Sequence, residues 1–431
     1  MKFKLWNYIL PSVISMVLVG TYTNIDGLFI GNVTGDDGLA AINFAWPIVA
    51  FITSLGTGVG VGGSVLLNQL RGQGDIQGAE RIKSTMLGVL AGVGVLFTLL
   101  FLFTYKPLLV LMGAKGQVLI YACEYSKIVS LGAFFQIMGS GLVALLRNEQ
   151  KTYFSMVCCI VGLVVHIVLD AFLVQTYTLA GVGVSTVLSQ AVIMVLCFLA
   201  LKEKGKKFSF AFDFKNVLPI LKASSSPLGI NFVPSVVLLF TNYFAETAGG
   251  TAAVSAYAVM SYAVYTFDYV FQGICDGVQP IVSFCHGAGD KEQENRALKV
   301  SAIVSVVCAL AFAALTPLLI YGMPKVFATS AQAEEMMKTG FIFYAFSYLF
   351  KAAVKYVGSY YYAIGKTARS NLLVYADPLF FTPLLLWALS SWMGLNGVWL
   401  AMTVSQVCVS ALGAATFLLK NKKKDKENSP V

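Results

Sequence analysis

The chain has 431 residues, of which 57% are hydrophobic and only 12% are charged, and its formal net charge is +9. No soluble core accommodates so much apolar sequence, and many segments exceed the roughly 20 apolar residues that a helix needs to cross a bilayer. The composition therefore excludes a soluble enzyme and predicts an integral membrane protein. In such a protein basic charge records topology, so no nucleic-acid partner is expected.

Apolar runs separated by polar turns predict about twelve membrane-spanning helices. The first six are expected at 5–30, 41–68, 84–105, 118–146, 153–175 and 179–201. The second six are expected at 218–245, 254–283, 297–320, 338–363, 370–390 and 396–419. Lys2 and Lys4 make the first run resemble a secretory signal, but it continues to about Ile30 without a cleavage site, so we interpret it as a membrane helix.

A stretch at 56–81, an apolar glycine-rich segment ending in a polar turn, recurs at 271–296, 215 positions later. The matched pairs are Gly58/Gly273, Gly62/Gly277, Gly72/Gly287, Gly74/Gly289, Asp75/Asp290 and Arg81/Arg296. The same offset pairs Gly35/Gly250, Ala41/Ala256, Lys151/Lys366, Thr152/Thr367 and Ser155/Ser370, and an offset of 216 pairs Gly181/Gly397 and Ser189/Ser405. We conclude that the chain is a duplicated unit.

The duplication predicts four segments along the chain. They are an N-terminal six-helix lobe at 1–201, a cytoplasmic linker at 202–217, a C-terminal six-helix lobe at 218–419 and a basic cytoplasmic tail at 420–431. Six is an even number, so both lobes enter the membrane from the same side, and we expect a pseudo-two-fold axis along the membrane normal. The predicted fold class is all-α, with about twelve transmembrane helices in two six-helix bundles.

The distribution of lysine and arginine predicts the orientation. With the N-terminus placed inside, most basic residues fall on the cytoplasmic side, and only Lys106, Lys115, Lys325 and Lys338 fall outside. Both termini and the linker are therefore predicted to be cytoplasmic, in a multi-pass protein of the cell membrane.

Signatures of catalysis and of cofactor binding are weak. Gly58, Gly60 and Gly63 fit a dinucleotide pattern, but no strand precedes them, and such glycines allow close packing of membrane helices. A phosphate-loop-like end at 365–367 lacks its first glycine, since Tyr360 stands there. The eight cysteines lack metal-ligand spacing, and neither HExxH nor G-x-S-x-G occurs. We therefore expect that the protein is not an enzyme and has neither an ATP site nor a cofactor. Any active transport would take its energy from an ion gradient or from a partner ATPase.

Ionisable residues within the predicted N-terminal helices mark a candidate ion site, because charge inside a membrane is costly. Asp26 lies in span 1, and His166 and Asp170 lie four positions apart on one face of span 5. Thr186 of span 6 is expected at the same depth, in the outer half of the membrane. The alternative is that these groups only cap helix ends near the outer headgroups.

The second half carries a different set of ionisable residues. They are Asp268 and Asp276 in span 8, Lys351 and Lys355 in span 10, and Asp377 in span 11. These residues either line a substrate cavity or form a structural salt bridge between the lysines and Asp377. Further polar residues that could line a cavity are Asn24, Asn43 and Gln136.

Several of these segments together resemble the multidrug and toxic-compound extrusion (MATE) family, in its bacterial MepA-like form. They are NIDGLFIG, LAAINFAWPI, GVGVGGSVLLNQLRGQGD, HIVLDAF, GVGVSTVLSQ and GICDGVQPIVSFCHGAGD. The resemblance implies two helical bundles forming a V, and export of organic cations in exchange for H⁺ or Na⁺ at an N-lobe acidic site. Asp26, Asp170 and Thr186 match the family's residues there, with Na⁺ held at the two acids. His166 stands where many relatives have asparagine, which favours a proton.

The sequence therefore predicts a secondary multidrug efflux antiporter that works by alternating access, with small organic substrates, the lipid bilayer as its environment and a monomeric state. Such a transporter would act in xenobiotic export and antibiotic resistance. One alternative is a lipid-linked saccharide flippase of the same superfamily, which should have a cationic central cavity and which Lys351 and Lys355 favour. The other is an uncoupled membrane channel.

Overall fold

The computed structural model describes residues 3–202, 212–327 and 330–427. Within the helices, the side chains of Thr23, Asn24, Asn32, Asp36 and residues 418–427 lie outside this description. The described residues form helices and the turns between them, with no strand among them.

The helices follow one another with short connections. In order they are α1 (Trp6–Gln73), α2 (Ile76–Leu111), α3 (Gly116–Leu131), α4 (Ala133–Asn148), α5 (Thr152–Leu201), α6 (Phe214–Ala288), α7 (Lys291–Val326), α8 (Ala331–Ala363), α9 (Thr367–Ala376), the π-helical turn η1 (Asp377–Phe381), α10 (Thr382–Met393) and α11 (Leu395–Glu427).

These elements make twelve membrane passes, which confirms the predicted number. The longest helices each contain one break, at Gly35 in α1, Thr178 in α5 and Gly250 in α6, and therefore count as two passes each. Helices α3 and α4 form one pass with a bend of 60°, and Thr367–Met393 forms another from α9, η1 and α10. The remaining passes are α2, α7, α8 and α11.

Two boundaries differ from those expected. Helix α6 begins at Phe214, inside the predicted linker, because the Asp213 side chain accepts a hydrogen bond from the Lys215 backbone N–H at 3.1 Å and caps the helix. Helix α11 continues to Glu427, inside the predicted tail. The rest of the linker, residues 203–211, lies outside the described residues.

The repeated polar turn has the same local structure in both halves. Gly74 and Gly289 end α1 and α6 in the left-handed region, with φ of 85° and 71°, which glycine adopts at no steric cost. Asp75 and Asp290 then cap the next helix by accepting a backbone N–H three residues later, at 2.8 and 3.1 Å. The backbone N–H of Gln293 lowers the pKa of the Asp290 carboxyl. The duplicated glycine and aspartate thus encode one helix–turn–helix connection.

The breaks at the other end of the molecule are duplicated too. Gly35 and Gly250, 215 positions apart, have φ/ψ of 62°/−146° and 66°/−163°. Thr178 and Gly394, 216 positions apart, have 50°/−126° and 57°/−134°. A positive φ costs a threonine about 1–3 kcal/mol, whereas glycine adopts it freely. The N-terminal repeat therefore keeps this backbone conformation although Thr178 stands where the C-terminal repeat has Gly394.

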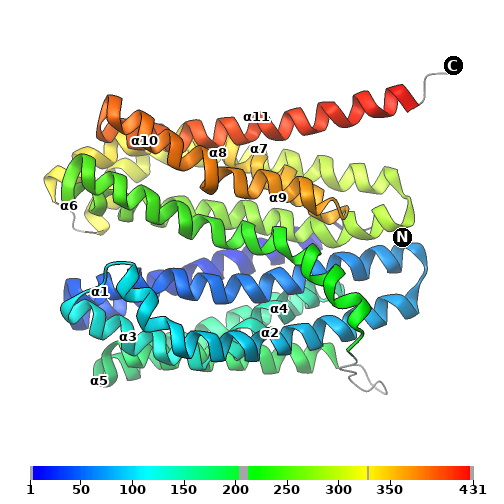
Figure 1. The fold of residues 1–431 in the computed structure, drawn as a ribbon, viewed down its shortest axis with the longest axis horizontal. Coiled ribbons are helices and arrows are strands. Elements are labelled where there is room, and N and C mark those ends of the chain that lie inside the picture. Colours follow the sequence, from blue (N-terminus) through cyan, green and yellow to red (C-terminus); the bar gives the residue numbers. More distant parts are fainter. Residues whose placement is uncertain (1–2, 203–211, 328–329, 428–431) are drawn as a thin grey trace.

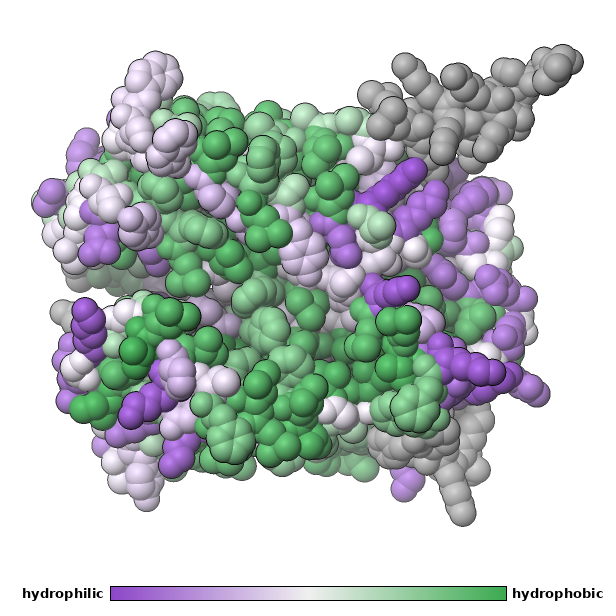
Figure 2. Space-filling model, viewed as in Figure 1, coloured by the Kyte–Doolittle hydropathy of each residue, from purple (hydrophilic) through white to green (hydrophobic). Residues whose placement is uncertain are grey.

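The two repeats form two helical lobes that lie side by side (Figure 1). Helices α1–α5 form the lower lobe in this view, and most of α6–α11 form the upper one. Both termini lie at the same end of the bundle, here called the terminal end (Figure 1). A broad apolar band separates two hydrophilic ends, and a notch divides the lobes at the end opposite the termini (Figure 2).

Helices α1 and α6 form the most extensive contact between elements and hold the lobes together. A Cβ atom at Gly72 would lie 2.2 Å from the carbonyl oxygen of Phe284, and one at Gly287 would lie 2.1 Å from that of Gln69. Gln69 and Phe284 are themselves 215 positions apart, so the two contacts are equivalent. Two further pairs of contacts are equivalent in the same way. The contact of Gly58 with Leu228 corresponds to that of Gly273 with Val13, and the contact of Gly62 with Ser224 corresponds to that of Gly277 with Ile9. These contacts have the pseudo-two-fold symmetry that the duplication predicts.

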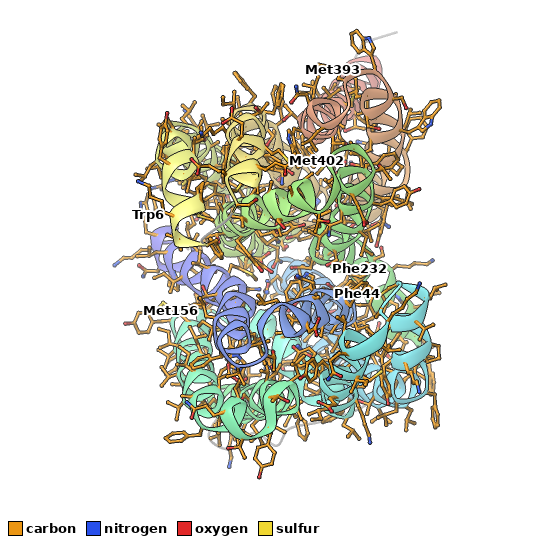
Figure 3. All side chains as sticks on the ribbon, turned by 90° about the vertical axis from the view of Figure 1, so that its left-hand side faces the viewer. Trp6, Phe44, Met156, Phe232, Met393 and Met402 are labelled. Carbon is orange, nitrogen blue, oxygen red and sulfur yellow. The ribbon has the colours of Figure 1, made fainter. Side chains whose placement is uncertain are left out.

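Close packing at the terminal end contrasts with the opposite end. Seen from that opposite end, Phe44 of α1 and Phe232 of α6 lie along the boundary between the lobes (Figure 3). Phe232 also contacts Phe51 of α1 edge to face, with ring centroids 5.0 Å apart. Because the close glycine contacts join the lobes toward the terminal end and the notch lies at the opposite end (Figure 2), the lobes form a V that is closed at the terminal end.

Candidate functional site

Three ionisable side chains meet inside the N-terminal lobe. His166 Nε2 lies 2.7 Å from Asp26 Oδ1 and 3.2 Å from Asp170 Oδ2. Asp26 is 5% exposed, and the other two are fully buried. Asp26 precedes the Gly35 break by nine residues, and Asp170 precedes the Thr178 break by eight. Along the helix axis, both aspartates therefore lie roughly 12–14 Å from the break that follows them. The structure thus brings together three of the four residues predicted for the ion site.

The charges of this cluster are unbalanced. Two carboxylates converge on one ring nitrogen, and each residue has a ligand atom within 4.8 Å of those of the others. Buried charge is costly unless it is compensated, so the cluster favours an additional positive charge. A proton shared among His166 and the two acids would supply it, and a small cation held by the Asp26 and Asp170 oxygens is the other candidate.

The surroundings of the cluster include residues that the sequence did not single out. The Tyr22 ring packs against the His166 ring, with centroids 4.7 Å apart. Thr186 is buried, and its hydroxyl donates to the Val182 carbonyl of its own helix at 2.9 Å rather than to a residue of the cluster. Tyr125 of α3 is also buried, in the neighbourhood of Thr186 and the two aspartates. Tyr22 precedes Asp26 by four positions, a spacing that could have identified it.

The other N-lobe residues proposed for a cavity have separate positions. Gln136 is buried and donates from Nε2 to the Thr53 hydroxyl at 3.2 Å, which ties α4 to α1. Asn43 is exposed on α1. Asn24 lies in α1, but its side chain is outside the described part of the structure. Among the contacts that the described residues make, neither Gln136 nor Asn43 adjoins the cluster of Asp26.

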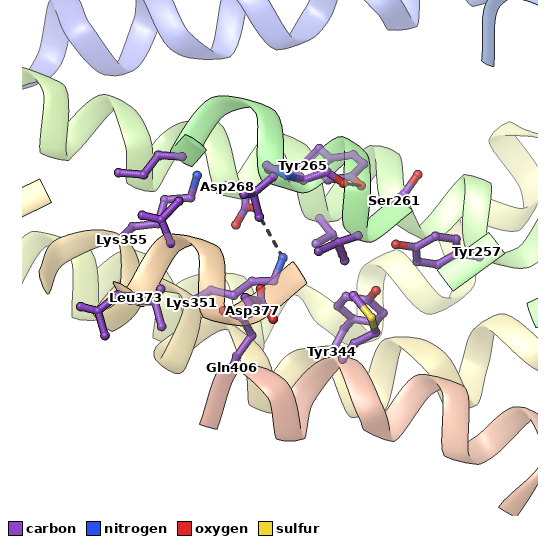
Figure 4. A pocket seen from close by; sticks show the side chains of 18 residues that line it. Tyr257, Ser261, Tyr265, Asp268, Tyr344, Lys351, Lys355, Leu373, Asp377 and Gln406 are labelled. Carbon is purple, nitrogen blue, oxygen red and sulfur yellow. Dashed lines mark hydrogen bonds and ion pairs between the residues drawn. The ribbon is translucent and has the colours of Figure 1, made fainter. Parts of the chain in front are cut away.

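A pocket lies within the C-terminal lobe, between α6, α8, α9, η1 and α11 (Figure 4). It holds about 90 Å³ of space that the centre of a water molecule can reach. Asp268, Lys351, Lys355 and Asp377 all line it, as predicted for a cavity. The remaining lining is mostly apolar and tyrosine side chains.

The lysines of this pocket do not have the predicted partner. Lys351 Nζ lies 3.5 Å from Asp268 Oδ2, and Lys355 Nζ lies 3.5 Å from the Gln272 side-chain oxygen. Among the described residues neither lysine forms an ion pair with Asp377. The salt bridge considered between span 10 and Asp377 is therefore absent from the described part of the chain.

Neutral donors surround the Asp377 carboxylate instead. The Thr382 hydroxyl donates to it at 2.7 Å and the Gln406 amide at 2.8 Å, and the Ser405 hydroxyl donates as well. Hydrogen bonds of this kind compensate a buried carboxylate without a cation. These neutral donors explain why Asp377 has no need of a lysine partner.

Asp276 was predicted to line a cavity, but it is not among the residues that line this pocket. Its Oδ2 atom lies 3.1 Å from Arg147 Nη2, and both side chains are only 2% exposed. Gln272 also donates to its Oδ1 at 2.8 Å. Arg147 belongs to α4 and Asp276 to α6, so the two residues form an ion pair between the lobes.

Comparison with known proteins identifies the family. The family model described as MatE matches residues 11–172 and 228–375, one segment in each repeat. Multidrug export protein MepA of Staphylococcus haemolyticus is 24% identical to the chain, and that of Staphylococcus saprophyticus is 22% identical. Both alignments cover 96% of this chain and 93% of the relative.

Solved structures share the fold at low sequence identity. An outward-facing multidrug resistance MATE family transporter of the MOP superfamily matches with a TM-score of 0.89 at 21% identity, over 98% of this chain and 96% of that chain. A MOP superfamily transporter from Pyrococcus furiosus, described for the reverse polarity of its binding pocket, matches with a TM-score of 0.90 at 20% identity, over 99% and 96%. Because the family model matches most of the sequence, the chain belongs to the MatE family.

Proposed function

We propose that the protein is a secondary active multidrug efflux transporter of the cell membrane, in which inward movement of protons drives the export of organic compounds. The observation that carries this proposal is the buried cluster of Asp26, His166 and Asp170 inside one lobe of a two-lobed membrane protein. The relatives named multidrug export proteins support the substrate class. The closed terminal end supports alternating access between the lobes.

The proton is the coupling ion that the donor set favours. An imidazole nitrogen between two carboxylates binds a proton readily, and the added charge reduces repulsion between Asp26 and Asp170. Helices α1 and α5 would then pack differently in the two charge states. An ion can drive transport only through such a difference in affinity for two conformations. Na⁺ held by the carboxylate oxygens is the second candidate.

Reconstituted vesicles test the function. We expect a proton gradient alone to drive uptake of cationic dyes into vesicles that contain the inserted protein, and a sodium gradient of the same size to drive little. Dye fluorescence would be followed for a panel of compounds, with protein-free vesicles as the control. Transport that needs neither gradient would support the uncoupled channel, and transport driven only by sodium would replace the proton with Na⁺.

The orientation is a further expectation, since the closed terminal end should face the cytoplasm. Gln77 and Gln117 are both exposed; Gln77 lies in the first turn of α2, and Gln117 lies in the first turn of α3, beyond the other end of α2. In a cysteine-free background, Gln117→Cys should react with an impermeant thiol reagent in intact cells. Gln77→Cys should react only after the cells are permeabilised. The reverse pattern would discard this orientation.

The flippase alternative receives less support. A lipid-linked pyrophosphate needs an excess of positive charge, whereas the C-lobe pocket contains the carboxylates of Asp268 and Asp377 beside its two lysines. Because the formal charges of these four side chains cancel, the pocket has no cationic surplus. Export of smaller compounds fits the pocket better.

A further inference from the structure

We propose that the pocket of the C-terminal lobe binds a small aromatic compound with a single carboxylate, held by the ammonium group of Lys355. This inference rests on the proposed export function, because it names one class of compound that the transporter would carry. It extends that function from organic cations to organic anions and to compounds with both charges.

The argument begins with the charges that are already compensated. Asp377 accepts hydrogen bonds from three neutral side chains, so its charge is stabilised within the protein. Lys351 has Asp268 as its partner, although the 3.5 Å separation is longer than the 2.7–2.9 Å usual for such pairs. Each of these three residues therefore already has direct partners within the protein.

The formal charges of the pocket cancel overall, but Lys355 has no charged partner in direct contact among the described residues. An ammonium group has three donors, and among the described residues that of Lys355 has one hydrogen-bond partner, the Gln272 amide oxygen at 3.5 Å. Across the described ranges no carboxylate forms an ion pair with it. An ammonium inside a membrane protein is costly without a partner, so this end of the pocket favours an anionic group.

The other end of the pocket favours an aromatic body. Tyr257, Tyr265 and Tyr344 lie together there, away from Lys355 (Figure 4). The Tyr265 hydroxyl donates to the Pro234 carbonyl at 3.1 Å, which fixes the position of that ring. Aromatic rings pair with other rings at about 0.5–1.5 kcal/mol beyond simple burial. The pocket therefore offers an ammonium at one end and ring surfaces at the other.

The charges also argue against two other occupants. A purely cationic compound would meet Lys351 and Lys355, whose charges repel it. A compound with several anionic groups would meet Asp268 and Asp377. One carboxylate on an aromatic body gives Lys355 an anionic partner, and a second, positively charged group could lie at Asp268.

A binding experiment on the purified full-length protein tests this inference. The probes are naphthalene-2-carboxylate and its neutral analogue naphthalene-2-carboxamide, titrated in detergent at neutral pH by calorimetry. We expect the carboxylate to bind at least about tenfold more tightly than the amide, as expected for a charge-assisted hydrogen bond. Equal binding of the two probes would overturn the proposal.

Variants of α8 separate Lys355 from general effects of charge. Lys355→Gln should remove the preference for the carboxylate, while Lys355→Arg should retain it. The matched control is Lys338→Gln, which changes a lysine of the same helix that pairs with Glu334 and Glu335 outside the pocket. A preference that survives Lys355→Gln would overturn the proposal, and the arginine variant keeps the test valid if glutamine impairs folding.

The test is independent of the coupling mechanism. Binding in detergent requires no ion gradient, so Asp26→Asn should keep the preference for the carboxylate even though it should lose efflux. Loss of the preference in Lys355→Gln with normal export of cationic dyes would support the pocket assignment by itself. Absence of gradient-driven export with intact carboxylate binding would refute the proposed function and leave the pocket assignment standing.

Discussion

Asp26→Asn and Asp170→Asn are each expected to reduce gradient-driven efflux to the background of protein-free vesicles. Asparagine has nearly the shape of a protonated aspartic acid, but it cannot release a proton. The cluster around His166 would then remain in one charge state, and the ion could no longer favour one conformation over the other. Folding should survive, since a neutral amide in place of a buried carboxylate reduces the repulsion within the cluster.

The measurement compares initial rates of dye export at several imposed proton gradients. Asp37→Asn is the matched control, because it makes the same change in the same helix at an exposed position. Yield and melting temperature should be similar for all variants. If either cluster variant exports dye at the wild-type rate with the same dependence on the gradient, the ion site lies elsewhere.

The fold could be predicted where its signals are local. Gly74 and Asp75 belong to a turn whose chemistry is contained in neighbouring residues, so their recurrence at Gly289 and Asp290 identified the duplication. The break at Thr178 carried no such signal, because threonine seldom adopts a positive φ. Its equivalence to Gly394 is evident only from the backbone.

The ion site was partly predictable for a similar reason. His166 and Asp170 share a helix face through their four-residue spacing, and the depth of Asp26 follows from its distance along span 1. Tyr125 approaches from α3, and no pattern in the sequence relates that helix to the site.

The partners of the C-lobe charges required the tertiary structure. Lys351 lies 83 positions from Asp268, and the order of helices around the lobe decides that α6, rather than η1, faces it. Arg147 was assigned only to the cytoplasmic side. Its contact with Asp276 depends on how two lobes dock, which no spacing within one lobe reveals.

The second large effect is expected when the ion pair of Arg147 and Asp276 is broken, because this pair joins the lobes near the closed terminal end. Asp276→Asn would leave the Arg147 guanidinium buried without a carboxylate, a change that typically costs about 3–5 kcal/mol. The cost applies only while the lobes are closed at this end. We therefore expect both a lower melting temperature and a shift of the population toward the opposite conformation.

Reaction of an introduced cysteine measures that shift. Ser224 is 3% exposed and packs against Gly62 of α1 across the lobe boundary, so Ser224→Cys in a cysteine-free background should react slowly with a hydrophilic thiol reagent. Adding Asp276→Asn should accelerate the reaction, while adding Asp37→Asn should not. Each 1.4 kcal/mol lost from the closed state raises the ratio of open to closed molecules about tenfold.

A double substitution separates the loss of the ion pair from the burial of a lone charge. Arg147→Met combined with Asp276→Leu removes both charges and fills the space with apolar side chains, a change that is often neutral or stabilising. This variant should recover most of the melting temperature and the slow reaction of the cysteine. If Asp276→Asn alone already behaves as the wild type in both measurements, the pair does not hold the terminal end closed. If the double variant is closed and stable but exports no dye, the charges themselves are needed for the lobes to separate during the cycle.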